Sequence, residues 1–412
     1  MKKGKNVGFI LCFGIKQIKF CIMTINNVLF RINFLGIKMK LTIHKGTNEI
    51  GGNCVELKTE NTTILLDYGT PLKENSEKIK IDKTNAILIS HPHQDHFGEI
   101  VHIENHIPVY CGKLSLELMN TTQIFTGAKP FNNNFKYFKD KKSFKIGDFT
   151  VTPYLVDHSA VDAYAFLIES DGKRILYSGD FRANGRKSKL FYRMIYDEKL
   201  KNIDILILEG TMLKRSNEEF INEQSVEEKI YQTVQNENIS FLISSSQNID
   251  RIVSAYRASK RSNKIFVVDI YTAWVLEKLK IVSKSVPNID WSDVKVIKTY
   301  GGGYYQKLKE NKAYFKEFTS KVFSNIIEVE EIKQNPKKYF LKVSPWYIEK
   351  LLKLFDLKKA NIIYSMWKGY LKEEFSDKKT VNLYKNLQKY NWTYAHTSGH
   401  ADLATLKISF RN

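Results

Sequence analysis

The sequence is poor in cysteine and proline, with only 4 and 8 residues of these types among 412. Its cysteines have neither the paired spacing of a metal knuckle nor the density of a disulfide framework, which favours a reducing, cytoplasmic location. With 21 glycines and 43% hydrophobic residues, the composition excludes long disorder or low complexity. The length suffices for two domains, or for one domain with a large insertion.

Residues 1–38 contain no acidic residue and no long apolar run. Lys16, Lys19 and Arg31 interrupt the apolar runs before any of them reaches the ~18 residues that a membrane span needs, so we expect no stable membrane insertion. The stretch also lacks the small-residue cleavage site of a signal peptide. Because Met39 opens a typical first strand, we expect 1–38 to be a poorly ordered extension or the product of an upstream start. A peripheral membrane anchor is the alternative.

The chain has fewer acidic than basic residues. It contains 64 Lys and Arg and 44 Asp and Glu, which gives a formal net charge of +20. Such an excess favours a polyanionic partner, and above all a nucleic acid, over a small neutral one. The alternative is an ordinary lysine-rich surface, which proteins that bind no nucleic acid also have.

Short β-branched runs bounded by turn residues predict an α/β domain over 39–210. Several runs are continuously apolar, as in strands that are buried on both faces of a sandwich. The clearest are Thr63–Leu66, Ala86–Ser90, Thr150–Val156, Arg174–Ser178 and Ile203–Leu208.

A second α/β domain is predicted over 211–385, where strands and helices alternate as in parallel sheets. Ser225 and Glu228 have the spacing of a capping box and predict a helix to about residue 236. A histidine-containing segment follows over 386–412, so we expect the chain to return there to the first domain.

Polar side chains follow four of the predicted strands of the first domain, at the point where each strand ends. These residues are Asp67, His91, Asp180 and Glu209. Because the loops at one edge of an α/β sheet converge, the pattern predicts a single site.

The segment His91-Pro-His93-Gln-Asp95-His96 places three imidazoles and a carboxylate within six residues. Buried side chains of this kind need partners, so packing does not explain such a density. Imidazole and carboxylate are ligands that suit zinc, and the segment therefore predicts a metal site.

The motif His-x-His-x-Asp-His after an apolar strand resembles the signature of the metallo-β-lactamase superfamily. That resemblance implies an αββα sandwich with one metal on His91, His93 and His158. It implies a second metal on Asp95 and His96, with Asp95 also a catalytic residue. Asp180 would bridge the two metals, and Asp67 would brace the site from behind.

Two metals ~3.5–4 Å apart lower the pKa of a bridging water from about 15.7 toward 7, which makes hydroxide available at neutral pH. We expect Zn2+ in both sites, with Mn2+ or Mg2+ as alternatives.

Further motifs resemble the β-CASP branch of the superfamily, and ribonuclease J-like proteins in particular. Glu209 matches the acidic motif A, and His400 in His396-Thr-Ser-Gly-His400 matches the motif B histidine. The segments 46–52 and 180–187 also match, and the domain over 211–385 corresponds to the inserted β-CASP domain. The resemblance implies that His400 protonates the leaving oxygen and that Glu209 orients His400.

Several residues are predicted to contact substrate phosphates. The resemblance implies this role for Ser398 and for the backbone at Gly399. The resemblance also implies phosphate contact for Ser246, Asn248 and Arg251. These residues lie at the start of a predicted helix, where free N–H groups favour anions. The alternative for this last group is simple helix capping.

The motif C histidine of the β-CASP family has no counterpart, because none of the nine histidines follows His400. We therefore expect a truncated last segment, with a true variant that recruits a partner as the alternative. We also expect a weaker second metal site, with a single bound metal as the extreme case.

The favoured function is that of a metal-dependent hydrolase that cleaves phosphodiester bonds, in RNA rather than DNA, with a homodimer as one oligomeric state to test. The alternatives are a nucleic-acid-binding relative without turnover and a hydrolase of small thioesters or lactams. The inserted domain and the basic excess argue against the last of these.

Overall fold

The computed structural model describes residues 9–13, 30–33, 39–46, 51–71, 83–213, 221–298, 303–343, 351, 353–356, 359–371, 385, 387–388, 390 and 392–409. The chain divides into two compact units. The first unit comprises Met1–Asn120, Phe131–Asn217 and Gly399–Asn412, and the second comprises Thr121–Pro130 and Glu218–Ser398.

The first unit contains two sheets. One has the order β2 (Phe30–Asn33), β3 (Lys40–Lys45), β4 (Cys54–Lys58), β5 (Thr63–Leu66), β6 (Ala86–Leu88), β7 (Val109–Cys111) and β8 (Phe135–Tyr137). The other has the order β1 (Phe9–Phe13), β13 (Ile205–Glu209), β12 (Lys173–Tyr177), β11 (Tyr164–Ser170), β10 (Phe149–Leu155) and β9 (Phe144–Ile146). Parallel pairing runs from β5 to β8 and between β12 and β13.

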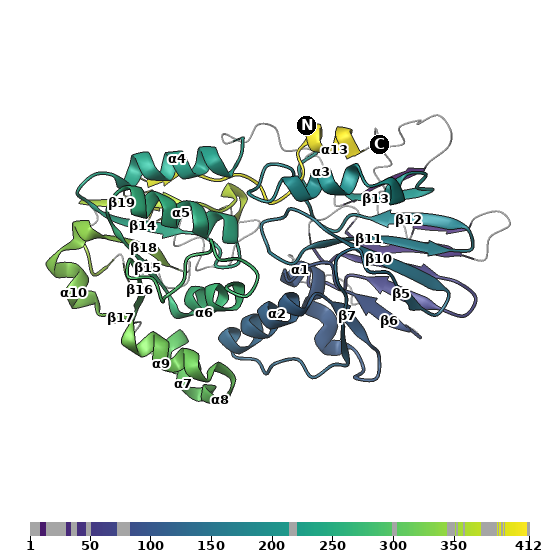
Figure 1. The fold of residues 1–412 in the computed structure, drawn as a ribbon, viewed down its shortest axis with the longest axis horizontal. Helices are drawn as coiled ribbons and strands as arrows, with labels where there is room; N and C mark the ends of the chain where they lie inside the picture. The colour runs from purple at the N-terminus through teal and green to yellow at the C-terminus, as the bar shows by residue number, and fades with distance from the viewer. Residues whose placement is uncertain are drawn as a thin grey trace. The chain divides into compact units, whose positions relative to one another are not determined.

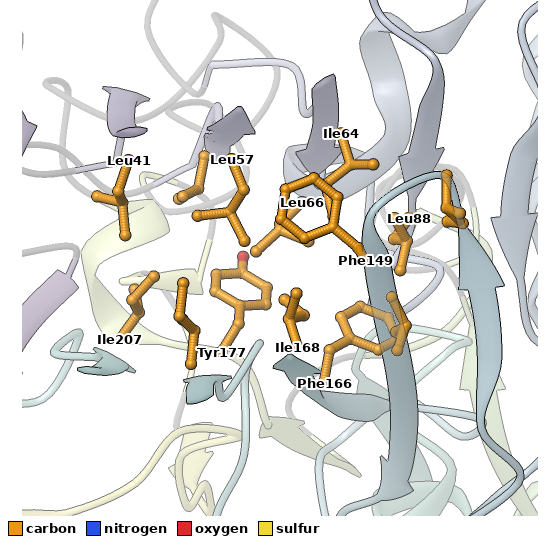
Figure 2. Packing of buried hydrophobic residues seen from close by; sticks show 14 of the residues in the cluster. Leu41, Leu57, Ile64, Leu66, Leu88, Phe149, Phe166, Ile168, Tyr177 and Ile207 are labelled. Carbon is orange, nitrogen blue, oxygen red and sulfur yellow. The ribbon is translucent and has the colours of Figure 1, made fainter. Parts of the chain in front are cut away.

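The two sheets of the first unit pack face to face. Figure 2 shows side chains of the first sheet, such as Leu57 and Leu66, directed toward Phe166, Ile168 and Tyr177 of the second. The labelled side chains are all essentially inaccessible to solvent. The interdigitated layer is the main hydrophobic core of this unit, and burying apolar surface here stabilises it by about 25 cal/mol per Å2.

Helices cover the outer face of each sheet. Phe97 of α1 (Gln94–Phe97) and Met119 of α2 (Lys113–Thr126) pack on the outer side of β5, β6 and β7. Phe191 of α3 (Lys189–Ile195) and Leu406 of α13 (Leu403–Ser409) pack on the outer side of β11 and β13. The unit is therefore an αββα sandwich, as predicted (Figure 1). Two 3-10 turns, η1 (Gly98–His102) and η2 (Glu198–Leu200), complete it.

The second unit is built on a seven-stranded sheet in which every pair is parallel. Its order is β17 (Ile326–Ile327), β16 (Val294–Ile297), β15 (Ile265–Val268), β18 (Tyr339–Val343), β14 (Ile239–Ile243), β19 (Ala360–Tyr364) and β20 (Trp392–Tyr394). In the part of this unit that the structure describes, the helices are α4 (Glu223–Val234), α5 (Ile249–Arg261), α6 (Ile270–Leu279), α7 (Tyr304–Glu310), α8 (Lys312–Phe315), α9 (Glu317–Ser324) and α10 (Val329–Gln334), with the 3-10 turns η3 (Pro336–Lys338) and η5 (Lys368–Leu371).

Three features differ from the predictions. The N-cap of α4 is Asn222, and Ser225 is the far partner of that capping box rather than its cap, because the helix begins at Glu223. The chain rejoins the first unit at Gly399 and not at residue 386, because β20 pairs with β19.

Within 1–38, two segments form strands, since β1 pairs with β13 and β2 with β3. Within the described ranges, every helix is too short or too polar to cross a membrane.

Candidate metal centre

Loops at the ends of β5, β6, β12 and β13 bring the predicted residues of the first unit together. His91 lies just beyond β6, Asp180 lies just beyond β12, and Glu209 is the last residue of β13. Among the described residues, three overlapping groups could each hold a metal ion, with the ligand atoms of each group within 4.8 Å of one another. They are His91, His93 and His158; His91, His96 and Asp180; and Asp180, Glu209 and His400.

The first group has the dimensions of a zinc site. Nδ1 of His93 lies 3.1 Å from Nε2 of His91 and 3.2 Å from Nε2 of His158. Ligands that are ~2.0–2.1 Å from a tetrahedral zinc ion are ~3.3 Å apart, so the observed spacing fits that ion. Asp180 lies near the same nitrogens, with Oδ2 3.7 Å from His91 and 4.0 Å from His158.

Hydrogen bonds behind the rings determine which nitrogens face this group. The Ser90 hydroxyl donates to Asp67 and lies 3.0 Å from Nδ1 of His91, so it accepts the proton of that nitrogen. Nδ1 of His158 donates to the carbonyl oxygen of Gly399 at 2.6 Å. Both rings therefore direct an unprotonated Nε2 toward His93. Converging lone pairs repel one another unless a cation lies between them, and the arrangement is typical of a metal site.

Burial keeps these histidines neutral. Desolvation lowers the pKa of His91 and His158 well below the ordinary value, and the neighbouring histidines add to the effect. Burial also lowers the pKa of His93. Neutral imidazole is the form that ligates a metal, so this part of the site is ready to bind one at neutral pH.

The second group includes the carboxylate of Asp180, and Asp95 lies near it without belonging to any of the three groups. Nε2 of His96 lies 3.3 Å from Oδ2 of Asp180 and 3.8 Å from Oδ2 of Asp95. Burial opposes a charge on His96, but Asp180, Asp67 and Asp95 raise its pKa well above the ordinary value. Burial also opposes the charge of Asp180, yet His96 and His400 hold its pKa well below the usual range. This position therefore favours positive charge.

Asp67 supports both groups from the interior. One of its oxygens accepts from Nδ1 of His96 at 2.6 Å, from the Tyr177 hydroxyl at 2.6 Å and from the Ser90 hydroxyl at 2.8 Å. The other oxygen accepts from the Ser90 amide. A fully buried carboxylate with this many donors is fixed in place, and it fixes the orientation of the His96 ring.

Glu209 and His400 form a pair beside Asp180. Oε2 of Glu209 lies 3.1 Å from Nδ1 of His400, and Oε1 accepts from the Ala401 amide at 2.8 Å. Glu209 is buried, whereas the His400 side chain is 23% exposed. The carboxylate thus holds one nitrogen of a ring that solvent can reach.

The predicted phosphate contacts of the second unit are engaged in internal bonds. Asn248 caps α5 by accepting from the Arg251 amide, and the Ser246 hydroxyl lies 2.9 Å from Thr272 Oγ1. Arg251 is completely buried and forms a double hydrogen bond with Glu223. This arrangement is that of a helix cap and a buried ion pair, so it corrects the role predicted for Arg251.

The other two predicted phosphate contacts precede His400. Ser398 is buried at the end of the second unit. Gly399 contributes its carbonyl oxygen to His158, as described above, which is a support for the metal centre that the sequence did not predict.

Ser90, Tyr177 and Asn53 also belong to the site but were not among the predicted residues. Ser90 directly precedes His91, and Tyr177 ends β12 three residues before Asp180, so their position beside strand ends was the available signal. Asn53 lies 2.7 Å from Nε2 of His96.

His102 and His106 are exposed and lie apart from the three groups.

Residues 62–239 match the family model described as the beta-lactamase superfamily domain. Ribonuclease J of Helicobacter pylori is 29% identical over 159 residues, which cover 35% of this chain and 23% of that protein. An RNase J-like protein of Methanocaldococcus jannaschii is 28% identical over 279 residues, which cover 62% of this chain and 63% of that protein. The match thus spans less than two thirds of the length of either relative.

Among solved structures, a protein of unknown function from Enterococcus faecalis V583 has a similar fold. The TM-score is 0.69 at 18% sequence identity, and the match covers 90% of this chain and 91% of that chain. At this identity the likeness establishes the fold alone.

Proposed function

Since the chain has a metallo-β-lactamase-fold domain and is similar to ribonuclease J-like proteins, we propose that it is a metal-dependent nuclease that hydrolyses phosphodiester bonds in RNA. The observation that carries the proposal is the convergence of His91, His93 and His158 on a common point beside Asp180.

The first metal would be held by His91, His93 and His158, and the second by Asp95 and His96, with Asp180 shared. Three nitrogen donors suit zinc at the first position. When bound, the two cations would lower the pKa of a water molecule toward neutrality and offset charge on the phosphate oxygens.

His400 is the proposed proton donor to the leaving oxygen. Its Nδ1 faces the Glu209 carboxylate, which stabilises the doubly protonated ring. The proton on Nε2 is then the one that passes to the leaving group. Glu209 is held in turn by the Ala401 amide, so the ring has a fixed orientation.

Three observations support a nucleic acid as the substrate. The formal charge of +20 favours a polyanion, and phosphate binding by Lys and Arg is sequence-independent. Ribonuclease J is the name of several relatives, which favours RNA over DNA. The Lys187 side chain, which donates to the backbone carbonyl of His158, adds a positive charge close to the metal centre.

The test compares wild type with His93→Ala on labelled RNA and labelled DNA, each with added Zn2+ or Mn2+. His106→Ala is the matched control, because His106 is 76% exposed and lies outside the metal groups. We expect cleavage of RNA by wild type and His106→Ala, and its loss in His93→Ala. Salt-sensitive RNA binding without any cleavage by wild type would favour the alternative of a binding protein and would refute the proposal.

A further inference from the structure

Asn53 is a buried side chain directed at the metal centre. It is 6% exposed, and its carboxamide nitrogen Nδ2 lies 2.7 Å from Nε2 of His96. Nε2 is the nitrogen of His96 that also faces Asp180 and Asp95. The side chains of Asn53, Asp180 and Asp95 therefore all lie within 4 Å of Nε2 of His96, the last three of these residues being the proposed second metal site.

The backbone holds Asn53 in this position. Gly51 and Gly52, which directly precede Asn53, have φ values of 85° and 68° that a side chain rarely tolerates. The Asn53 amide donates to the carbonyl of Asp95 at 3.0 Å, and its own carbonyl accepts from the Gly69 amide at 3.1 Å. Asn53 is thus bonded on both sides to the loops that carry Asp95 and Asp67.

Two of the distances at Nε2 of His96 match those between ligands of one ion. Two ligands at ~2.1 Å from an octahedral cation are ~3 Å apart, and the 2.7 Å distance to Asn53 and the 3.3 Å distance to Asp180 lie on either side of this value, whereas Asp95 is farther away at 3.8 Å. A half-turn of the planar carboxamide exchanges Nδ2 and Oδ1 without changing its shape. Asn53 can therefore present its oxygen to a cation with no repacking of the buried site.

We propose that Asn53 is a ligand of the second metal, which it binds through its carboxamide oxygen. The inference rests on the proposed function, because it assumes that Asp95, His96 and Asp180 together hold an ion. With Asn53 included, the second site has three oxygen donors and one nitrogen, whereas the first site has three nitrogens. Oxygen-rich sites suit Mn2+ or Mg2+, so the second position selects a harder cation than the first.

Metal counting tests this role without measuring cleavage. Wild type, Asn53→Ala, Asn53→Asp and the exposed control Asn132→Ala are first loaded with Zn2+. Each is then titrated with Mn2+, the second ion being followed by calorimetry and by elemental analysis. We expect wild type and Asn132→Ala to bind two ions, and Asn53→Ala to retain the first with at least tenfold weaker affinity for the second. Asn53→Asp, which keeps the shape and the oxygen, should restore the second ion.

Retention of the first ion in Asn53→Ala shows that the fold is intact, so a loss of the second ion is specific. Equal second-site affinity in wild type and Asn53→Ala would overturn the inference, as would a wild type that binds one ion only. Neither result would contradict metal-dependent cleavage by the first site. Absence of any bound ion in wild type would instead contradict the proposed function itself.

Discussion

The carboxylate of Asp67 accepts a hydrogen bond from Nδ1 of His96 at 2.6 Å, and both side chains are completely buried. Asp67 stands just beyond β5, and His96 lies in α1, which follows β6. The bond therefore joins the segments that follow two neighbouring parallel strands of one sheet. It leaves the opposite nitrogen of His96 directed at Asp180.

Replacing Asp67 with asparagine should weaken the second metal site. The amide cannot accept from His96, Tyr177 and Ser90 as a carboxylate does, so the ring loses the partner that holds its proton on Nδ1. We expect affinity for the second ion to fall by about 10- to 100-fold, measured by calorimetry. Asp171→Asn is the control, because Asp171 is exposed and also has a positive φ, 49° against 59° for Asp67. Equal losses in the two variants would contradict the assignment.

Replacing Glu209 with glutamine should reduce turnover while both metals stay bound. The amide cannot stabilise a protonated His400, so we expect kcat on RNA to fall by about 10²- to 10⁴-fold with little change in KM. Steady-state kinetics and elemental analysis on the same preparation separate the two effects. An unchanged kcat, or loss of metal in parallel with kcat, would remove Glu209 from the proposed proton transfer.

Gly69→Ala should disrupt the site by steric overlap. A Cβ at this position would lie 1.6 Å from the carbonyl oxygen of Asp95, and backbone atoms cannot yield as a flexible side chain does. We expect a loss of about 1–3 kcal/mol in stability, typical of overpacking, together with weaker metal binding. Thermal unfolding with and without Mn2+ measures both. Thr70→Ala, at the exposed neighbouring residue, should behave as wild type.

Arg251→Ala should destabilise the second unit by about 3–5 kcal/mol, because it leaves the buried Glu223 without its partner. Arg257→Ala, on the same helix, removes a 49% exposed side chain and should cost ~0–1 kcal/mol. All five tryptophans of the chain fall within 218–398, so their fluorescence in urea reports on this unit. Similar midpoints for the two variants would contradict a structural role for Arg251.

The sandwich and the positions of its strands could be predicted because each strand has a local pattern in the sequence, a short apolar run bounded by turn residues. The predicted runs at Thr63–Leu66 and Ala86–Ser90, for example, correspond to β5 and β6. The histidine cluster could be predicted as a group able to hold a metal because its members are nearly consecutive. Asp180 and Glu209 could be included because each follows an apolar strand.

Other parts of the site depend on contacts between distant residues, which no local pattern reveals. Asn53 and His96 are 43 positions apart, and an asparagine after two glycines is typical of any turn. The Gly399 carbonyl that orients His158 belongs to the backbone and has no signature of its own. Arg251 was predicted to contact phosphate because polar residues at the start of a helix are typical of an anion site. The same pattern is found at a helix cap, and only the burial of Arg251 against Glu223 distinguishes the cap from the anion site.

The pairing of β1 with β13 protects the strand that ends in Glu209. Phe9 lies opposite Glu209 and Phe13 opposite Ile205, so the N-terminal segment occupies the hydrogen-bonding side of β13. A chain that started at Met39 would expose that side as a bare edge, a known template for intermolecular association. A shortened protein of this kind would carry every proposed metal ligand and yet be prone to aggregate through the strand that ends in Glu209, a member of the proposed proton-transfer pair.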